Sequence, residues 1–266
     1  SKYSELKMKS KIIFTILVLI GLSVVTSGQV SGISSSKLSV PRAEILEQGS
    51  FEFEPAFLVA HSSKCFNESG DACSINGEEV ASALGFRVTF GITENFEIGS
   101  VIPSNIENVG IGAKLNYLNS DFFKTSLIGG FGLPAGNAFL SDSVHDDNHY
   151  SASIGNVFSF FFSEESSADI MISYTGIIGE HPFNHVLSFQ SGYGYYLSEQ
   201  FQMIAEISGF TSISNSLYSG KLSVAPGFSY TVTNSLGLAA GFQYDILGKN
   251  ELQSLSYFAA FTILFN

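Results

Sequence analysis

The chain has 266 residues and a formal net charge of −12, with 12 lysines and arginines against 24 aspartates and glutamates. This acidic balance argues against nucleic-acid binding, which needs a basic surface that releases counterions. Tryptophan is absent, while 25 phenylalanines and 11 tyrosines are present, so an aromatic girdle at a membrane interface would be built from those two types.

The first 28 residues have the pattern of a secretory signal peptide. Lys7, Lys9 and Lys11 precede an apolar run from Ile12 to Val25, and small residues follow as far as Gly28. A run of this length is too short to favour a membrane helix. We therefore predict a signal peptide with upstream residues over 1–28.

Residues 29–48 are rich in serine and lack a sustained alternation of apolar and polar positions. A segment of this kind buries too little apolar surface to fold alone. The sequence predicts a flexible periplasmic N-terminal segment, and the alternative is an insert in the mouth of the domain that follows.

From Phe51 to the C-terminus the chain repeats one unit, in which about ten residues alternate between apolar and small or polar types before a break. Five breaks are short polar turns, at 92–95, 118–121, 163–166, 197–200 and 232–235, and the others are expected to be long loops. Short turns belong on the periplasmic side of outer-membrane barrels. The expected strands lie around 51–59, 84–90, 96–102, 109–117, 123–133, 150–162, 170–174, 187–195, 201–207, 222–230, 236–244 and 255–265.

Ten charged residues inside these segments all occupy the parity opposite to the apolar stripe. They are Glu52, Glu54, Arg87, Glu97, Lys114, Lys124, Asp169, Glu206, Lys221 and Asp245. Lipid solvates neither charges nor an open sheet edge, so the strands must close with these residues inside. We predict an all-β fold: a 12-stranded antiparallel transmembrane β-barrel over residues 49–266 in the bacterial outer membrane, with membrane lipid and the barrel-assembly machinery as partners.

A few residues fit the pattern badly or leave alternatives open. Pro55, Asn156, Ser191 and Pro226 fall on the outer parity, where we expect a bulge or register error at one or more of them. Many glycines take the inward parity, either to relieve strand curvature, which we favour, or to leave space in the lumen.

Cys65 and Cys73 lie in a polar stretch of a chain expected to be exported, and the residues between them can close a ring. Exported proteins meet an oxidising environment. We therefore predict a disulfide, with two free thiols as the alternative.

The inward charges, six acidic and four basic, allow two interpretations. Unpaired charges in a dry interior are costly, so the favoured interpretation is a network that stiffens and largely fills the lumen. The other is a narrow path for solutes lined by Glu52, Glu54, Arg87, Glu97, Lys114 and Lys124. Barrels of about eight strands have an interior filled by side chains, and barrels of about sixteen strands hold a water channel. A count of twelve strands therefore does not distinguish a filled lumen from an open one.

Histidines supply only weak candidates for other chemistry. His145, His149 and His181 could contribute to a metal site, but their spacing matches no known motif and a solvated loop is the simpler account. A hydrolase would need a serine beside His185, and Ser191 on the same strand is about 20 Å away. No catalytic residue and no cofactor are expected.

The first expected strand, GSFEFEPAF from Gly49, and the later stretch FRVTFGITENFEIGSVIP from Phe86 to Pro103 carry a family resemblance. They resemble the outer-membrane proteins known as the MetA pathway of phenol degradation family. The resemblance rests on Arg87, Gly91, Thr93 and Glu97 and covers about fifty residues. It implies a transporter for small, often hydrophobic compounds.

We therefore expect a porin-like passive channel for small solutes, hydrophobic or aromatic ones included. The alternatives are a non-conducting structural or surface-interaction barrel with a filled lumen and, less favoured, an outer-membrane hydrolase.

Overall fold

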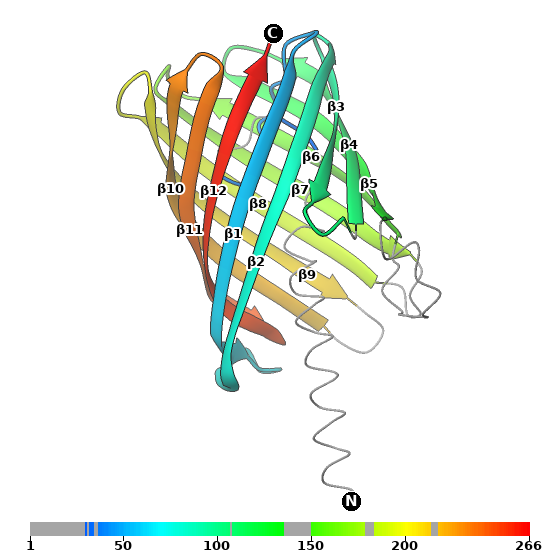
Figure 1. The fold of residues 1–266 in the computed structure, drawn as a ribbon, viewed down its shortest axis with the longest axis vertical. Coiled ribbons are helices and arrows are strands. Elements are labelled where there is room, and N and C mark those ends of the chain that lie inside the picture. Colours follow the sequence, from blue (N-terminus) through cyan, green and yellow to red (C-terminus); the bar gives the residue numbers. More distant parts are fainter. Residues whose placement is uncertain are drawn as a thin grey trace, which may run out of the picture.

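The computed structural model describes residues 30, 32–34, 37–106, 108–135, 150–178, 184–213 and 218–266. Within them, twelve antiparallel strands form one closed barrel, in which each strand pairs with its sequence neighbours and β1 closes the ring against β12 (Figure 1). The strands are β1 (Phe51–Phe66), β2 (Ala72–Thr93), β3 (Phe96–Pro103), β4 (Asn108–Asn119), β5 (Phe123–Pro134), β6 (Tyr150–Phe161), β7 (Ser166–Ile178), β8 (Asn184–Tyr196), β9 (Phe201–Ile213), β10 (Tyr218–Thr233), β11 (Leu236–Lys249) and β12 (Glu251–Phe265).

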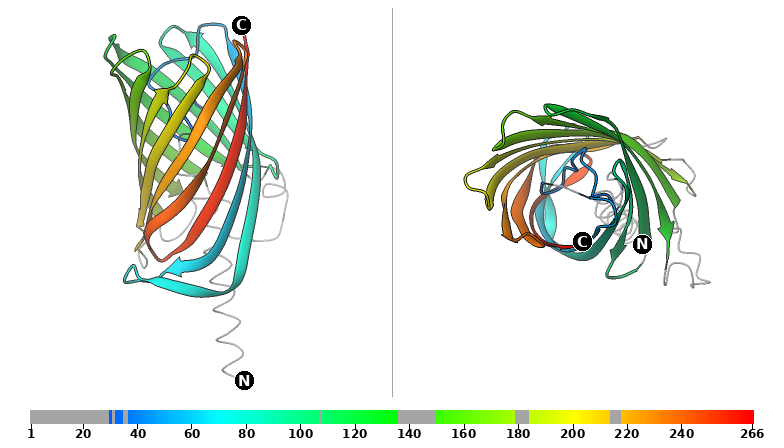
Figure 2. Two further views of the ribbon diagram at one scale, coloured as in Figure 1. Left: turned by 90° about the vertical axis from the view of Figure 1, so that its left-hand side faces the viewer. Right: turned by 90° about the horizontal axis from the view of Figure 1, so that it is seen from above.

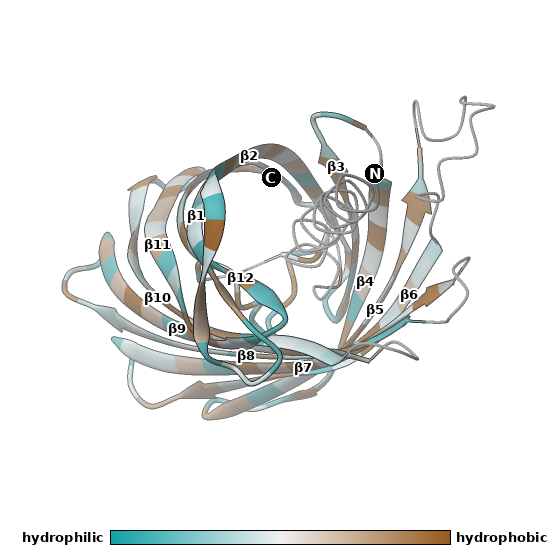
Figure 3. Ribbon diagram, turned by 90° about the horizontal axis from the view of Figure 1, so that it is seen from below, coloured by the Kyte–Doolittle hydropathy of each residue, from teal (hydrophilic) through white to brown (hydrophobic). Residues whose placement is uncertain are grey.

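The two faces of the wall differ in polarity. Apolar side chains such as Phe57, Phe131 and Ile154 are exposed on the outside, whereas Glu97 and Asp169 are fully buried on the inside. Figure 3 shows the resulting alternation of hydrophilic and hydrophobic residues along the strands. The predicted 12-stranded antiparallel barrel is confirmed. No helix among the described residues has the length and apolarity needed to cross a membrane.

Phenylalanine rings pair on the outer face near the short turns. The ring centroids of Phe123 and Phe160 lie 5.0 Å apart, and those of Phe201 and Phe228 lie 5.6 Å apart. Aromatic rings at this level anchor a barrel at the membrane interface.

The four outer-face residues that fitted badly cause no shift of register. Pairing of β1 with β12 lapses around Pro55 and pairing of β10 with β11 lapses around Pro226, yet the register on either side is unchanged. The pairs that contain Asn156 and Ser191 are continuous. The expected bulge or register error is therefore wrong at these positions, because a proline can drop one ladder bond while the flanking pairs hold the strands.

Two expected loops are shorter than predicted. β1 and β2 pair as far as Phe66 and Ala72 and form a long hairpin arm, although the sequence predicts a loop over most of 60–83. Only Asn250, with a positive φ of 52°, separates β11 from β12. Both strand extensions lack the apolar alternation that marks a lipid-facing strand, so the sequence pattern missed them.

The segment before β1 lies inside the barrel. We call its described part, residues 30, 32–34 and 37–50, the plug. Seen from above in Figure 2, this blue segment runs within the ring of strands, and Val30, Ile33, Val40 and Ala43 are buried. The described part of residues 29–48 therefore differs from the predicted flexible periplasmic segment and is closer to the alternative, an insert in the barrel. The reason is that the inner wall supplies the polar and apolar partners that this segment lacks by itself.

Candidate functional site: the plug and the inner wall

Inward glycines bring the plug close to the wall. A Cβ atom built on Gly91 would lie 2.2 Å from the carbonyl oxygen of Glu47, and one built on Gly99 would lie 1.9 Å from that of Gly32. Residues with a side chain at these two positions would collide with the plug backbone. At these positions the glycines provide space in the lumen, whereas the sequence alone favours relief of strand curvature as the role of inward glycines.

Glu97 and Lys114 form the first anchor of the plug. Glu97 accepts hydrogen bonds from the backbone N–H and hydroxyl of Ser34, both at 2.6 Å, and from the N–H of Leu46 at 2.7 Å. The Lys114 ammonium lies 3.1 Å from Glu97 and donates to the carbonyl oxygens of Ser34 and Arg42. Two fully buried and opposite charges thus bind plug groups that come from either end of the segment.

Glu206 forms the second anchor. Its carboxylate accepts hydrogen bonds from the backbone N–H groups of Leu38 (2.8 Å), Ser39 (3.0 Å) and Val40 (3.3 Å), and from the Ser39 hydroxyl (2.6 Å). The plug forms a turn here, because the N–H of Lys37 donates to the carbonyl of Val40. Consecutive N–H groups in a turn make a concave site for an anion, and the carboxylate of the barrel occupies it.

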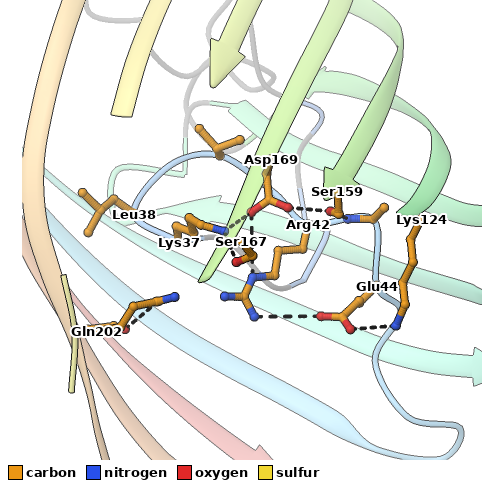
Figure 4. A network of polar contacts seen from close by, with 12 residues as sticks. Lys37, Leu38, Arg42, Glu44, Lys124, Ser159, Ser167, Asp169 and Gln202 are labelled. Carbon is orange, nitrogen blue, oxygen red and sulfur yellow. Dashed lines mark hydrogen bonds and ion pairs between the residues drawn. The ribbon is translucent and has the colours of Figure 1, made fainter. Parts of the chain in front are cut away.

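Asp169 forms the third anchor, shown in Figure 4. The Lys37 ammonium pairs with Asp169 and donates to the Ser167 hydroxyl at 3.0 Å. The Arg42 Nε atom lies 3.8 Å from the same carboxylate, and the Ser159 hydroxyl donates to it. Asp169 is fully buried, so the two plug cations and the Ser159 hydroxyl replace the water that it would otherwise need.

A fourth contact lies nearer the surface. Lys124 reaches Glu44 of the plug at 2.9 Å, and Arg42 lies 3.9 Å from the same carboxylate. Both partners are partly exposed, so this contact is weaker than the buried anchors.

Apolar contacts support the anchors. Plug and wall side chains share one buried cluster, made of Val30, Ile33, Ala43, Ile128, Val157 and Met171. The plug is therefore packed against the wall as well as hydrogen-bonded to it.

The ten inward charges divide into two groups. Glu97, Lys114, Lys124, Asp169 and Glu206 contact the plug, as described above. The others pair along the wall: Arg87 with Glu52 at 2.9 Å and Glu54 at 2.8 Å, and Lys221 with Asp245 at 2.9 Å.

The remaining candidate residues are a cysteine pair and several histidines. Cys65 and Cys73 form a disulfide near the tip of the β1–β2 arm. His145, His149 and His181 lie outside the described residues, and no group of three or more metal-binding side chains occurs among the residues that are described. The Nδ1 atom of His185 pairs with the Tyr174 hydroxyl.

Sequence reasoning missed the residues that make the plug, chiefly Ser34, Lys37, Arg42 and Glu44. Their partners lie far away in sequence, as with Lys37 and Asp169, which are 132 positions apart. The inward glycines were the available signal, because they mark where the wall leaves room for backbone.

No family model and no curated protein matches this sequence. Among solved structures, the COG4313 outer membrane channel from Pseudomonas putida F1 aligns over 84% of this chain and 98% of its own, with 10% identity and a TM-score of 0.69. The KdgM porin in complex with disordered oligogalacturonate aligns over 82% and 99%, with 10% identity and a TM-score of 0.51. The translocator domain of autotransporter NalP from Neisseria meningitidis aligns over 82% and 89%, with 9% identity and a TM-score of 0.50.

These likenesses, at about a tenth identity, concern the fold. They agree with the closed ring, the apolar outer face and the polar interior, which a bilayer requires of a spanning sheet. The chain has the fold of a bacterial outer-membrane β-barrel.

Proposed function

We propose that the protein is a passive outer-membrane channel for small solutes, and that its own N-terminal plug closes the lumen at rest. The proposal rests on one observation: the plug is joined to the wall mainly through buried hydrogen bonds and ion pairs centred on Glu97, Asp169 and Glu206. Water can replace such partners, and each hydrogen bond to a charged group contributes about 1.5–3 kcal/mol net. These contacts join the plug to the wall and are separate from the hydrogen bonds between strands. A shift of the plug therefore leaves the strand ladders intact.

The solute class follows from resemblance. The family that Arg87, Gly91, Thr93 and Glu97 resemble implies small and often hydrophobic compounds. The COG4313 protein with a similar fold is a channel, and KdgM is a porin, which supports passage over catalysis. The same resemblance to outer-membrane barrels implies insertion by the barrel-assembly machinery.

The second candidate is a non-conducting barrel with a filled lumen, which the burial of the anchors favours. Conductance across planar bilayers and solute uptake by liposomes separate the two. We expect rare openings for wild type and openings at least several times more frequent for Glu206→Gln, because this change weakens a plug anchor. Asp245→Asn is the matched control, since Asp245 is an equally buried carboxylate that pairs with Lys221 on the wall. If wild type and Glu206→Gln both show no conductance and no solute uptake, the filled barrel is the correct interpretation.

A further inference from the structure

A hollow of about 550 Å³ lies beside the point where the plug runs into β1. It is lined by Gln48 of the plug, by Thr93, Glu94 and Asn95 of the β2–β3 turn, and by Asn116, Tyr117 and Asn119 near the end of β4. Its volume is within the range of ligand sites, roughly 300–1,000 Å³. It lies at the end of the barrel that carries the short turns, since the β2–β3 turn forms part of its lining.

The lining favours a ligand with amide groups. Gln48, Asn95, Asn116 and Asn119 each carry a carboxamide, which both donates and accepts hydrogen bonds. Among the described residues of the lining, Glu94 is the only one with an ionised side chain. A lipid chain would find few apolar partners here, and an anion would meet the Glu94 carboxylate.

Asn116 connects the hollow to the plug. It is buried, and its amide nitrogen donates to the carbonyl of Ala43 at 3.0 Å. The plug therefore holds Asn116 in place and also supplies Gln48 to the lining.

One side of the hollow is a free strand edge. Pairing of β3 with β4 ends at Phe96 and Leu115, whereas pairing of β4 with β5 continues to Asn119 and Lys124. Beyond Asn116, whose N–H donates to the carbonyl of Asn95, β4 has a strand neighbour on one side only. A free edge offers backbone donors and acceptors to an extended peptide.

A similar arrangement occurs at the β10–β11 turn, which supplies a position for a control variant. The N–H of Thr231 on β10 donates to the carbonyl of Gln200, as that of Asn116 does to Asn95. The β10–β11 turn carries Asn234 between Thr233 and Ser235. In this turn the N–H of Ser235 donates to the Thr233 hydroxyl, as the N–H of Asn95 donates to the Thr93 hydroxyl in the β2–β3 turn.

We propose that this hollow binds a short extended peptide that is neutral or basic. The peptide backbone meets the carboxamides and the edge of β4, and a basic side chain lies beside Glu94. The proposal does not depend on whether the lumen conducts.

The test is a titration of the full barrel, in lipid nanodiscs, with an acetylated and amidated Ser-Lys-Ser tripeptide, followed by calorimetry. Ser-Glu-Ser and N-acetylglucosamine serve as comparison ligands. We expect saturable one-site binding of the Lys peptide with a Kd on the order of 1 mM, and binding of the Glu peptide about fivefold weaker.

Two variants locate the site. Glu94→Gln should remove the preference for the Lys peptide, and Asn119→Ala should weaken both peptides. Asn234→Ala should bind like wild type, and all variants should keep the gel mobility of the folded barrel. The proposal is overturned if the Lys peptide shows no saturable binding, if Glu94→Gln and Asn119→Ala leave binding unchanged, or if the sugar binds more tightly than the peptide.

Discussion

Lys114 of β4 and Glu97 of β3 face each other across the strand pair, with 3.1 Å between ammonium and carboxylate and no solvent exposure on either side chain. Each ion has given up its water, so each depends on its partner and on the plug groups around the pair. The stability of the barrel therefore depends on this pair, and the pair in turn depends on the position of the plug.

Removing one member of the pair should cost more than removing both. Glu97→Gln leaves the Lys114 ammonium buried without its counter-ion, which should lower the free energy of unfolding by about 3–5 kcal/mol. The double variant Glu97→Gln with Lys114→Met should lose less, because a methionine needs no charged partner. Urea unfolding in lipid vesicles, followed by far-ultraviolet circular dichroism, gives these values. A double variant as unstable as Glu97→Gln would contradict this dependence.

Glu206→Gln should loosen the plug locally. The change replaces a charged acceptor of three backbone N–H groups with a neutral one, at a cost of about 1–3 kcal/mol. Amide hydrogen exchange at Leu38, Ser39 and Val40 should then accelerate by about tenfold or more. Mass spectrometry of peptides from residues 37–46 measures the change, and peptides from β9 and β10 should exchange as in wild type. Unchanged exchange in the plug would mean that Glu206 does not hold it.

Gly91→Ala should displace the plug while sparing the wall. The three atoms closest to the added Cβ would all belong to Leu46 and Glu47 of the plug. Gly85→Ala on the same strand is the matched control, because no atom of the described part of the chain lies within 4 Å of its Cβ position. We expect a higher opening frequency in planar bilayers for Gly91→Ala and wild-type behaviour for Gly85→Ala. Equal behaviour of the two variants would show that the plug tolerates the added methyl group.

Reduction of the Cys65–Cys73 disulfide should free the tip of the β1–β2 arm. The bond closes a short ring, worth roughly 2–3 kcal/mol by chain entropy. Backbone bonds between Asn67 and Gly70 and between Asn250 and Asn67 then remain to hold the tip. Limited proteolysis with and without reductant should show new cleavage within 67–71 only in the reduced protein. Cleavage at equal rates in both states would argue that strand pairing alone holds the arm.

The membrane-spanning wall was predictable because lipid imposes one rule on every strand. An ionised residue such as Asp169 or Lys221 must face inward, so parity alone locates the strands and closes the ring. The rule ends where lipid ends. The polar extensions of β1, β2, β11 and β12 show no alternation of apolar and polar residues, so the sequence predicts loops there.

The plug could not be predicted in the same way. Its contacts join single residues to wall positions on distant strands, as Lys37 does with Asp169 and Ser39 with Glu206. Such contacts depend on the closed ring and leave no period in the sequence of residues 37–50. An inward glycine such as Gly99 marks the space for the plug, but the sequence alone favours relief of strand curvature as its role.

The ten charged groups on the wall have a consequence for any open passage. These ten groups are six carboxylates and four cations, so without the plug they carry a net charge of two negative units. Asp169 loses the positive partners Lys37 and Arg42 once the plug has moved. Departure of the plug thus changes what the passage admits as well as its width, and the vacated interior should prefer positive ions to negative ones.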